Sequence, residues 1–226
     1  MKPFIPVVLV MCIYLSGSVS AGLNGKSLIF DKKTNTDFVR FHAADFSSLT
    51  AFTVCLRAGS EIGKGYSLFT YATHNYKNEL LLWQRSRSQI CVYISNKAVM
   101  FTLADMTATL RRICVSWESK GGETTVWING QRSIQEIAGK GRVVGGNGQF
   151  TLGQYQSSVG KPFNKRNSFV GEITDVNMWD RVLNANEIES FNDRCYRGGG
   201  NIINWGTTAF TKGGDFVIKD NHDCPH

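Results

Sequence analysis

Residues 112–119 read RICVSWES, and apolar and polar side chains alternate along them. Ile113, Val115 and Trp117 fall on one side of an extended chain, and the residues between them fall on the other. The same period of two recurs in four further segments, at residues 39–41, 52–56, 90–94 and 99–103. Short strands of this kind, separated by Gly and Asn clusters, predict an all-β fold, either an antiparallel β-sandwich or a barrel.

One turn is specified by its two central residues. The strand predicted at residues 124–128 runs directly into Asn129 and Gly130. Both centre positions of a type I′ turn need left-handed backbone, which Asn and Gly adopt more readily than other residues. We therefore expect a two-residue β-hairpin here.

One short helix is predicted after Leu183. Asn184 can accept hydrogen bonds from the first-turn amides, and Glu187 stands three residues later, as a capping box requires. Leu183 and Ile188 can close a hydrophobic staple over the first turn. Ile188 and Phe191 then lie on one apolar face of the helix.

The N-terminus has the pattern of a secretory signal peptide. Lys2 precedes a short apolar run at residues 4–15, and small residues follow up to Ala21. This order is typical of a cleaved signal, and the run is too short to span a bilayer. We predict a signal peptide at 1–21 and one domain at 22–226, because no linker-like stretch divides the remaining chain.

Charge and cysteine content restrict the class of protein. The chain has 25 Lys and Arg against 18 Asp and Glu, with a pI near 9.2. This mild positive excess would suit anionic partners, but net charge alone is better explained by a generic solvated surface. No nucleic-acid motif is present. Of the six cysteines, Cys12 leaves with the signal, and the remaining odd number requires one free thiol or an intermolecular bridge. These remaining cysteines are Cys55, Cys91, Cys114, Cys195 and Cys224.

The polar tail after Phe210 is expected to be less ordered than the rest. It ends in an H-x-C-x-H pattern formed by His222, Cys224 and His226. Because a second pair of ligands is missing, we expect a disordered end rather than a zinc or copper site.

The sequence does not predict an enzyme. No G-x-S-x-G nucleophile elbow occurs. A glycosidase on a sandwich needs two carboxylates on one face, whereas Glu172 and Asp175 are three residues apart and are expected on opposite faces of a strand.

The opening octamer resembles the pentraxin signature H-x-C-x-[ST]-W-x-[ST], with Arg112 in place of the leading histidine. Segments at 51–56, 65–73, 176–180 and 204–205 resemble the family in order and spacing, so the resemblance covers roughly residues 26–205. It implies a flattened antiparallel jelly roll, similar to lectin and laminin-G sandwiches, with one helix and usually five subunits in a disc.

The resemblance also implies a disulfide between Cys55 and Cys114, which chain entropy would make worth about 4 kcal/mol. A second pair, Cys195 with Cys224, would leave Cys91 unpaired.

Pentraxins bind ligands through two neighbouring calcium ions, and the resemblance places the ligand positions of this family in three stretches. The family's Asp-Asn pair is Lys77-Asn78 here, and its Glu-Gln-Asp is replaced by residues 155–157, which read YQS. A further Glu and Gln are replaced by Asn164 and Asn167. Only Asn78 and, through its backbone carbonyl, Gln156 keep the family's identity. Because calcium affinity follows the charge of its oxygen ligands, we expect calcium, the family's cofactor, to bind weakly or not at all.

Basic residues in the same loops suggest what replaces the metal. Lys77, Lys161, Lys165 and Arg166 can supply positive charge to a ligand-binding face for phosphate or sulfate groups. The family's two choline-binding positions are occupied by Trp83 and Ala98 in this chain. Trp83 can still offer an aromatic face to a cation. Two alternatives remain open: a site that has drifted and binds nothing, or a displaced metal site that uses Glu79, Asp175 or another acid.

These expectations combine into a secreted, extracellular recognition protein of humoral innate immunity, with the acute-phase character of its family. The protein is expected to form a ring-shaped homo-oligomer, and the resemblance implies a pentamer. Multivalency would then combine weak contacts at single sites into tight binding. Complement-type proteins are candidate partners. The alternatives are a structural component of an extracellular coat or matrix, cross-linked through Cys91 or Cys224, and a calcium-dependent lectin-like binder.

Overall fold

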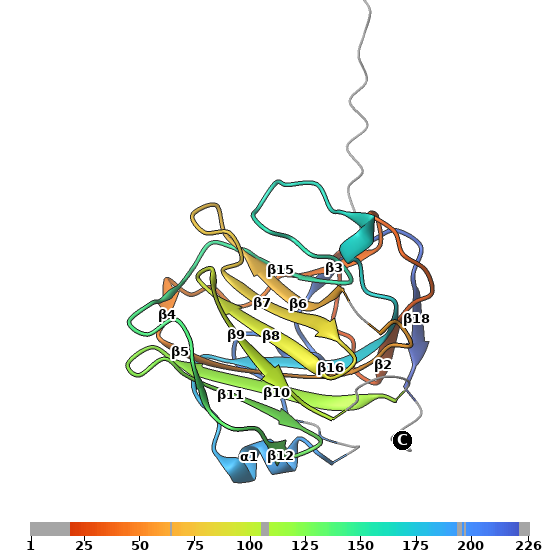
Figure 1. The fold of residues 1–226 in the computed structure, drawn as a ribbon. Coiled ribbons are helices and arrows are strands. Elements are labelled where there is room, and N and C mark those ends of the chain that lie inside the picture. Colours follow the sequence, from red (N-terminus) through yellow and green to blue (C-terminus); the bar gives the residue numbers. More distant parts are fainter. Residues whose placement is uncertain (1–18, 64, 105–108, 194–195, 197, 222–226) are drawn as a thin grey trace, which may run out of the picture.

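The computed structural model describes residues 19–63, 65–104, 109–193, 196 and 198–221. Two antiparallel sheets pack face to face, and short helices and loops cover their outer sides (Figure 1). Sheet A has the strand order β1 (Val19–Ser20), β17 (Phe210–Gly213), β3 (Phe38–Phe41), β15 (Gln149–Leu152), β6 (Tyr66–Ala72), β7 (Leu80–Ser86), β8 (Gln89–Ile94) and β9 (Lys97–Thr102).

Sheet B has the order β12 (Gln131–Arg132), β11 (Glu123–Ile128), β10 (Arg111–Glu118), β5 (Ala51–Gly59), β16 (Gly171–Trp179), β2 (Lys26–Phe30) and β18 (Val217–Asp220), and β13 (Glu136–Ile137) also pairs with β11. The remaining elements are the strand pair β4 (Ser48–Leu49) and β14 (Val144–Gly145) and the helices η1 (Lys165–Asn167) and α1 (Ala185–Ser190). The predicted antiparallel β-sandwich with one short α-helix is confirmed.

The signature octamer lies in the middle of sheet B. Ile113, Val115 and Trp117 of β10 are at most 1% exposed and face the core. On the other side of the strand, Cys114 lies opposite Cys55 of β5, and the two form a disulfide. The pairing that the resemblance implied is therefore present. It joins neighbouring strands across a sequence separation of 59 residues.

The predicted hairpin is confirmed by the backbone between β11 and β12. Asn129 and Gly130 both have positive φ, 49° and 82°. This is the left-handed conformation that a type I′ turn requires. Ile128 pairs with Gln131 directly across the turn.

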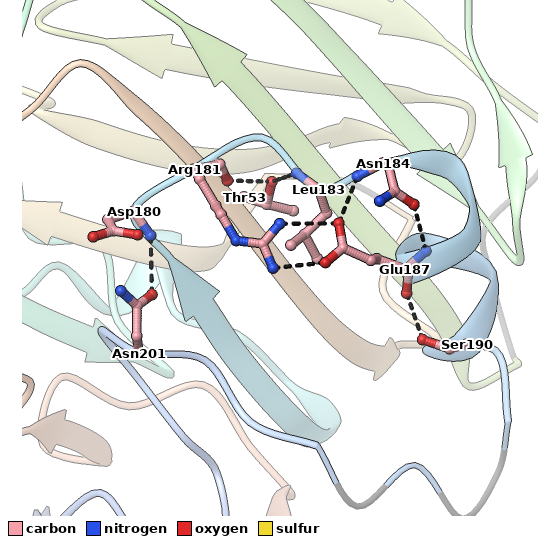
Figure 2. A network of polar contacts seen from close by, with 8 residues as sticks. All are labelled: Thr53, Asp180, Arg181, Leu183, Asn184, Glu187, Ser190 and Asn201. Atoms are coloured by element: carbon pink, nitrogen blue, oxygen red, sulfur yellow. Dashed lines mark hydrogen bonds and ion pairs between the residues drawn. The ribbon is translucent and has the colours of Figure 1, made fainter.

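Helix α1 begins with the predicted capping box (Figure 2). The Oδ1 of Asn184 accepts from the amide of Glu187 at 3.0 Å, and the Glu187 carboxylate accepts from the amide of Asn184 at 2.8 Å. Arg181 adds two further hydrogen bonds to the same carboxylate, at 2.6 and 2.9 Å. The segment is tied to sheet B by Thr53, whose hydroxyl accepts from the amide of Leu183 and donates to the carbonyl of Arg181.

The apolar side of this segment covers the outer face of sheet B. Ile188 and Phe191 are each 2% exposed, as the predicted apolar face requires. They join a second hydrophobic cluster, separate from the main core, with Cys55, Cys114, Trp127, Trp179 and Leu183. This part of the outer face of sheet B is therefore covered around the disulfide.

A β-bulge in β16 changes one expectation. The register of β16 with β5 shifts between Thr174 and Asn177, and Asp175 adopts a φ of 56°. Because the extra residue interrupts the alternation, Asp175 bonds Arg57 on the outer side of sheet B, at 3.3 Å. Glu172 faces that side too, since its neighbour Ile173 is in the core. The expectation of opposite faces for Glu172 and Asp175 is thus wrong.

The tail after Phe210 is also more ordered than expected. It forms β17, which pairs with β3 and β1, and β18, which pairs with β2. Between them Phe216 is 1% exposed and stacks on Phe30, with ring centroids 4.6 Å apart. The packing of Phe216 on Phe30 therefore orders the segment after Phe210, although its polar composition indicated little order.

Several sequence expectations lie outside the described residues. They include residues 1–18 of the predicted signal peptide, the His222, Cys224 and His226 tail, and Cys195. Val19 and Ser20, at the end of the predicted signal, pair with β17. Among the described residues Cys91 is a free thiol, but it is only 5% exposed, so a cross-link through it would require the strand to open.

Candidate ligand-binding face

Two loops meet on the outer side of sheet A, away from α1 (Figure 1). The loop between β6 and β7 carries Lys77 and Asn78. The amide of Asn78 donates to the carbonyl of Ser157 at 3.0 Å, and the amide of Val159 donates to the carbonyl of Thr73 at 3.2 Å. The structure therefore brings together two of the three stretches in which the resemblance placed the calcium ligands. The third stretch, with Asn164 and Asn167, lies at η1.

The side chain of Asn78 is already engaged by a neighbour. Its Oδ1 accepts from the phenol of Tyr155 at 2.6 Å, and its Nδ2 donates to Asn96 at 3.5 Å. Burial raises the pKa of Tyr155 above its ordinary value, so the phenol keeps its proton and acts as a donor. The ring of Trp83 meets Tyr155 edge-on, at a centroid distance of 5.7 Å. Tyr155 thus closes the space between Trp83 and Asn78.

At the other retained position, Gln156, the resemblance assigns the backbone carbonyl, and the side chain is engaged inside the protein. Gln156 is 3% exposed, and its Oε1 accepts from the hydroxyl of Thr151 at 3.1 Å. The side-chain oxygen of Asn78 therefore serves an internal hydrogen bond, and residues 77–78 and 155–157 supply no carboxylate. Calcium takes 6–8 oxygens, several of them charged, so this set does not fit the ion. Within the part of the chain that the structure describes, no three His, Cys, Asp or Glu side chains are grouped to hold a metal.

The acids considered for a displaced metal site are engaged elsewhere. Glu79 is fully buried, and its carboxylate accepts from the amide of Gly145 at 2.6 Å and from the hydroxyl of Thr73 at 3.4 Å. Burial raises the pKa of Glu79, opposed by these hydrogen bonds. Asp175 belongs to sheet B and faces Arg57. The two carboxylates therefore lie in different layers of the sandwich.

The predicted basic residues do not form a single group. Lys77 is exposed on the loop after β6, whereas Lys165 and Arg166 lie in η1. In Figure 1 this loop and η1, the teal coil, stand at opposite sides of the upper edge. The carbonyl of Arg166 accepts from Lys33 at 2.7 Å, which adds a cation that the sequence analysis did not single out.

Lys161 lies in a different setting, at a surface hollow of about 450 Å³. The hollow is lined by Asn35, Arg40, Gln149, Gln156, Val159, Gly160, Lys161, Pro162 and Phe163. Arg40 comes from β3, where Val39 and Phe41 face the core and Arg40 points outward. Sequence reasoning recorded this alternation but missed Arg40 as a site residue, because it did not predict which loop would lie over β3.

Arg40 has an unusual environment. Its Cζ lies 5.1 Å from the centroid of the Phe38 ring. Its Nε is buried and has no hydrogen-bond partner among the described residues. Burial lowers the pKa of Arg40 from its ordinary value, although a guanidinium stays charged in proteins. The hollow therefore contains a cation with unused hydrogen-bonding capacity.

Comparison with known proteins identifies the fold family. Residues 26–220 match the model of the Pentaxin family. The chain belongs to the pentraxin family. Mucosal pentraxin of Mus musculus is 36% identical over 206 residues, which cover 91% of this pentraxin and 92% of the relative. C-reactive protein of Cavia porcellus and serum amyloid P-component of Sus scrofa are each 36% identical and cover 87% of this chain and 88% of the relative.

Solved structures agree with the family at the level of the fold. A native heptameric SAP-like pentraxin from Limulus polyphemus superposes with a TM-score of 0.79 at 21% identity, over 91% of this pentraxin and 99% of that chain. The extracellular region of zebrafish Gpr126/Adgrg6 gives a TM-score of 0.72 at 19% identity, over 90% of this pentraxin and 27% of that chain. No helix in the described part of the pentraxin has the length and apolar character needed to cross a membrane.

Proposed function

We propose that this pentraxin is a secreted recognition protein of humoral innate immunity that binds phosphate-bearing or other anionic surface ligands without calcium. The observation that carries the proposal is the hydrogen bond from Tyr155 to Asn78, because it uses the oxygen that a family metal site would need. The relatives, which include C-reactive protein and serum amyloid P-component, support recognition rather than catalysis.

The architecture proposed for the mature protein follows from the sequence. A signal peptide at 1–21 would be removed, and one domain at 22–226 would remain. Cleavage after Ala21 would also remove β1, leaving β17 paired with β3.

Positive charge supports anionic ligands. Lys77, Lys161, Lys165 and Arg166 are all exposed in the loops over sheet A. Trp83, on β7, is partly exposed and offers an aromatic surface. In the family site a metal ion would balance a ligand's phosphate, and here basic side chains would do so. Single contacts of this kind are weak, so avidity is needed.

Ring assembly would supply that avidity. The solved SAP-like relative is a heptamer, and the family resemblance implies a pentamer for this chain. Two exposed isoleucines support an intersubunit contact: Ile134, between β12 and β13, is 84% exposed, and Ile137, in β13, is 59% exposed. Large apolar side chains this exposed are typical of contact surfaces when they occur close together.

A ligand array would test the proposal. The full chain, secreted from cells, would be applied to immobilised phosphocholine, phosphoethanolamine, sulfated glycans and nucleic acid, in calcium and again in chelator. We expect binding to at least one phosphate- or sulfate-bearing ligand, unchanged by chelator and weakened by salt. Binding that disappears with chelator would contradict the calcium-free mechanism, and no binding in either buffer would favour a site that has drifted.

A further inference from the structure

The hollow at Arg40 and Lys161 combines charge with an aromatic wall. The Phe163 ring lies 5.4 Å from the Phe38 ring between centroids, and Phe38 in turn carries the guanidinium of Arg40 at 5.1 Å. Val159 and Pro162 complete an apolar side. The guanidinium and the apolar wall are thus contiguous, which suits a ligand with an anionic end and an apolar body.

The polar groups of the hollow fit an anion. The Arg40 side chain lines the hollow, and Lys161 is exposed at the rim. Gln156 also lines the hollow, and because its Oε1 already accepts from Thr151, its amide nitrogen is the end that can donate. Guanidinium, ammonium and amide donors together match a tetrahedral oxyanion. No carboxylate lines this hollow.

A second, smaller hollow limits what the ligand can carry beyond its anion. Arg40 and Gln149 line it as well, and it has a volume of about 340 Å³. Its far end carries His42 and the exposed Asp45. A second negative charge on this side would meet the Asp45 carboxylate, so the surface favours one anionic group over a polyanion.

We propose that the anion-binding site of this pentraxin is the Arg40–Lys161 hollow, and that it takes an aryl phosphate or aryl sulfate ester. The oxyanion would bind Arg40, Lys161 and the amide of Gln156, and the aromatic ring would pack against Phe163. A phosphotyrosine or sulfotyrosine side chain of a partner protein carries this chemistry. The inference rests on the proposed function and moves its site away from the loop of Asn78.

Titration calorimetry with small probes tests the site on the whole assembled protein. Phenyl phosphate and phenyl sulfate would be compared with glycerol 2-phosphate and inorganic phosphate, all in chelator. We expect the aryl esters to bind at least about tenfold more tightly than glycerol 2-phosphate. The tighter of the two aryl esters distinguishes a phosphotyrosine from a sulfotyrosine source. Equal affinity for phenyl phosphate and glycerol 2-phosphate would overturn the aryl assignment.

Substitutions then locate the site. Lys161→Gln and Arg40→Gln should each weaken phenyl phosphate about tenfold, since each removes a charge-assisted hydrogen bond. Arg40→Lys keeps the charge but not the planar guanidinium, so it should lose less affinity than Arg40→Gln. Lys219 is exposed on β18 of sheet B, and Lys219→Gln should leave the affinity unchanged. Because Lys161 is exposed, its substitution tests the site even if Arg40 variants fold poorly.

The outcomes separate this inference from the broader proposal. The protein could bind anionic surfaces in chelator while Lys161→Gln and Arg40→Gln change neither this surface binding nor the affinity for phenyl phosphate. In that case the hollow is excluded as the site, and the proposed function remains. If no phosphate or sulfate ligand binds at all, both are overturned.

Discussion

At the scale of single residues, the candidate site differs from its family through one hydrogen bond. Tyr155 stands where the resemblance implies a glutamate, and its phenol donates to Asn78 rather than offering a carboxylate. Trp83 packs against the same ring. An aromatic side chain here replaces two charged oxygens with an apolar body and a hydroxyl that keeps its proton.

Returning acids to these positions should create a calcium site. In the variant Lys77→Asp, Tyr155→Glu, Ser157→Asp, the carboxylates would meet around Asn78, because the loops are already joined there. We expect calorimetry to show calcium binding with a Kd between about 10⁻⁵ and 10⁻³ M, where the parent shows none. Tyr155→Phe, which removes only the hydroxyl, should show no calcium binding in the same experiment. Micromolar calcium binding by the parent would contradict the proposed mechanism.

Glu79 should make stability depend on pH in an unusual direction. Burial raises its pKa in the folded state above the ordinary 4.5, so the folded protein holds the proton more tightly than the unfolded chain. Stability should therefore fall as pH rises from the ordinary pKa through the raised one.

The variant Glu79→Gln keeps an oxygen for the Gly145 amide and removes the titration. We expect its urea midpoint to fall less than that of the parent between pH 4.5 and 7. The exposed acid Glu61 provides a control, since Glu61→Gln should leave the parental pH dependence intact. Identical pH profiles for Glu79→Gln and the parent would show that this carboxyl does not titrate as described.

The site was only partly predictable from sequence, for a physical reason. Residue identities at 77–78 and 155–157 indicated the lost carboxylates directly. The bond between Tyr155 and Asn78 requires knowing that the two loops touch, and the role of Arg40 requires knowing that β3 lies beneath the loop of Lys161. Such juxtapositions depend on strand order, which alternation within one segment does not encode.

At the scale of elements, local signals proved reliable where the chain itself sets the conformation. The turn at Asn129-Gly130 and the cap at Asn184 formed as predicted, because their hydrogen bonds and dihedral angles involve neighbours in sequence. The bulge at Asp175 was not predictable, since a period of two assumes a regular strand. Order in the tail depends on the distant contact between Phe216 and Phe30.

The cap of α1 gives a prediction at this scale. Asn184→Ala removes the acceptor for the Glu187 amide and should lower the free energy of unfolding by about 1 kcal/mol. Asn184→Asp keeps an acceptor and should be nearly neutral. Urea denaturation of both variants measures the difference. Equal losses for the two would mean that the side-chain oxygen is not what stabilises the first turn.

At the scale of the whole molecule, the two outer faces of the sandwich differ in character. On the outer side of sheet B, α1 and a hydrophobic cluster cover the disulfide, and the Arg57–Asp175 ion pair lies on the same side. The outer side of sheet A carries polar loops and the hollows beside Arg40. Subunits arranged side by side in a ring would present all of these hollows in one direction, which is the geometry that multivalent binding needs.

The exposed segment between β12 and β13 is the place to test assembly. Ile134→Asp puts a charge where an apolar contact is proposed, and it should raise the subunit dissociation constant about tenfold or more. Sedimentation velocity over a dilution series measures this. Val182→Asp, at a different exposed apolar position, should leave the oligomer intact. An unchanged oligomer in Ile134→Asp would exclude this segment from the interface.

The Arg40–Lys161 hollow has a consequence for where a captured ligand is released. Carboxylates that hold a metal ion take up protons as vesicles acidify after uptake, and their cargo is then lost. A guanidinium and an ammonium remain fully charged at pH 5. A sulfate ester bound by them would keep its charge and stay bound on acidification. A phosphate ester has a second pKa of about 6, so it would lose part of its charge and be held less tightly. A rise in ionic strength would free either ligand.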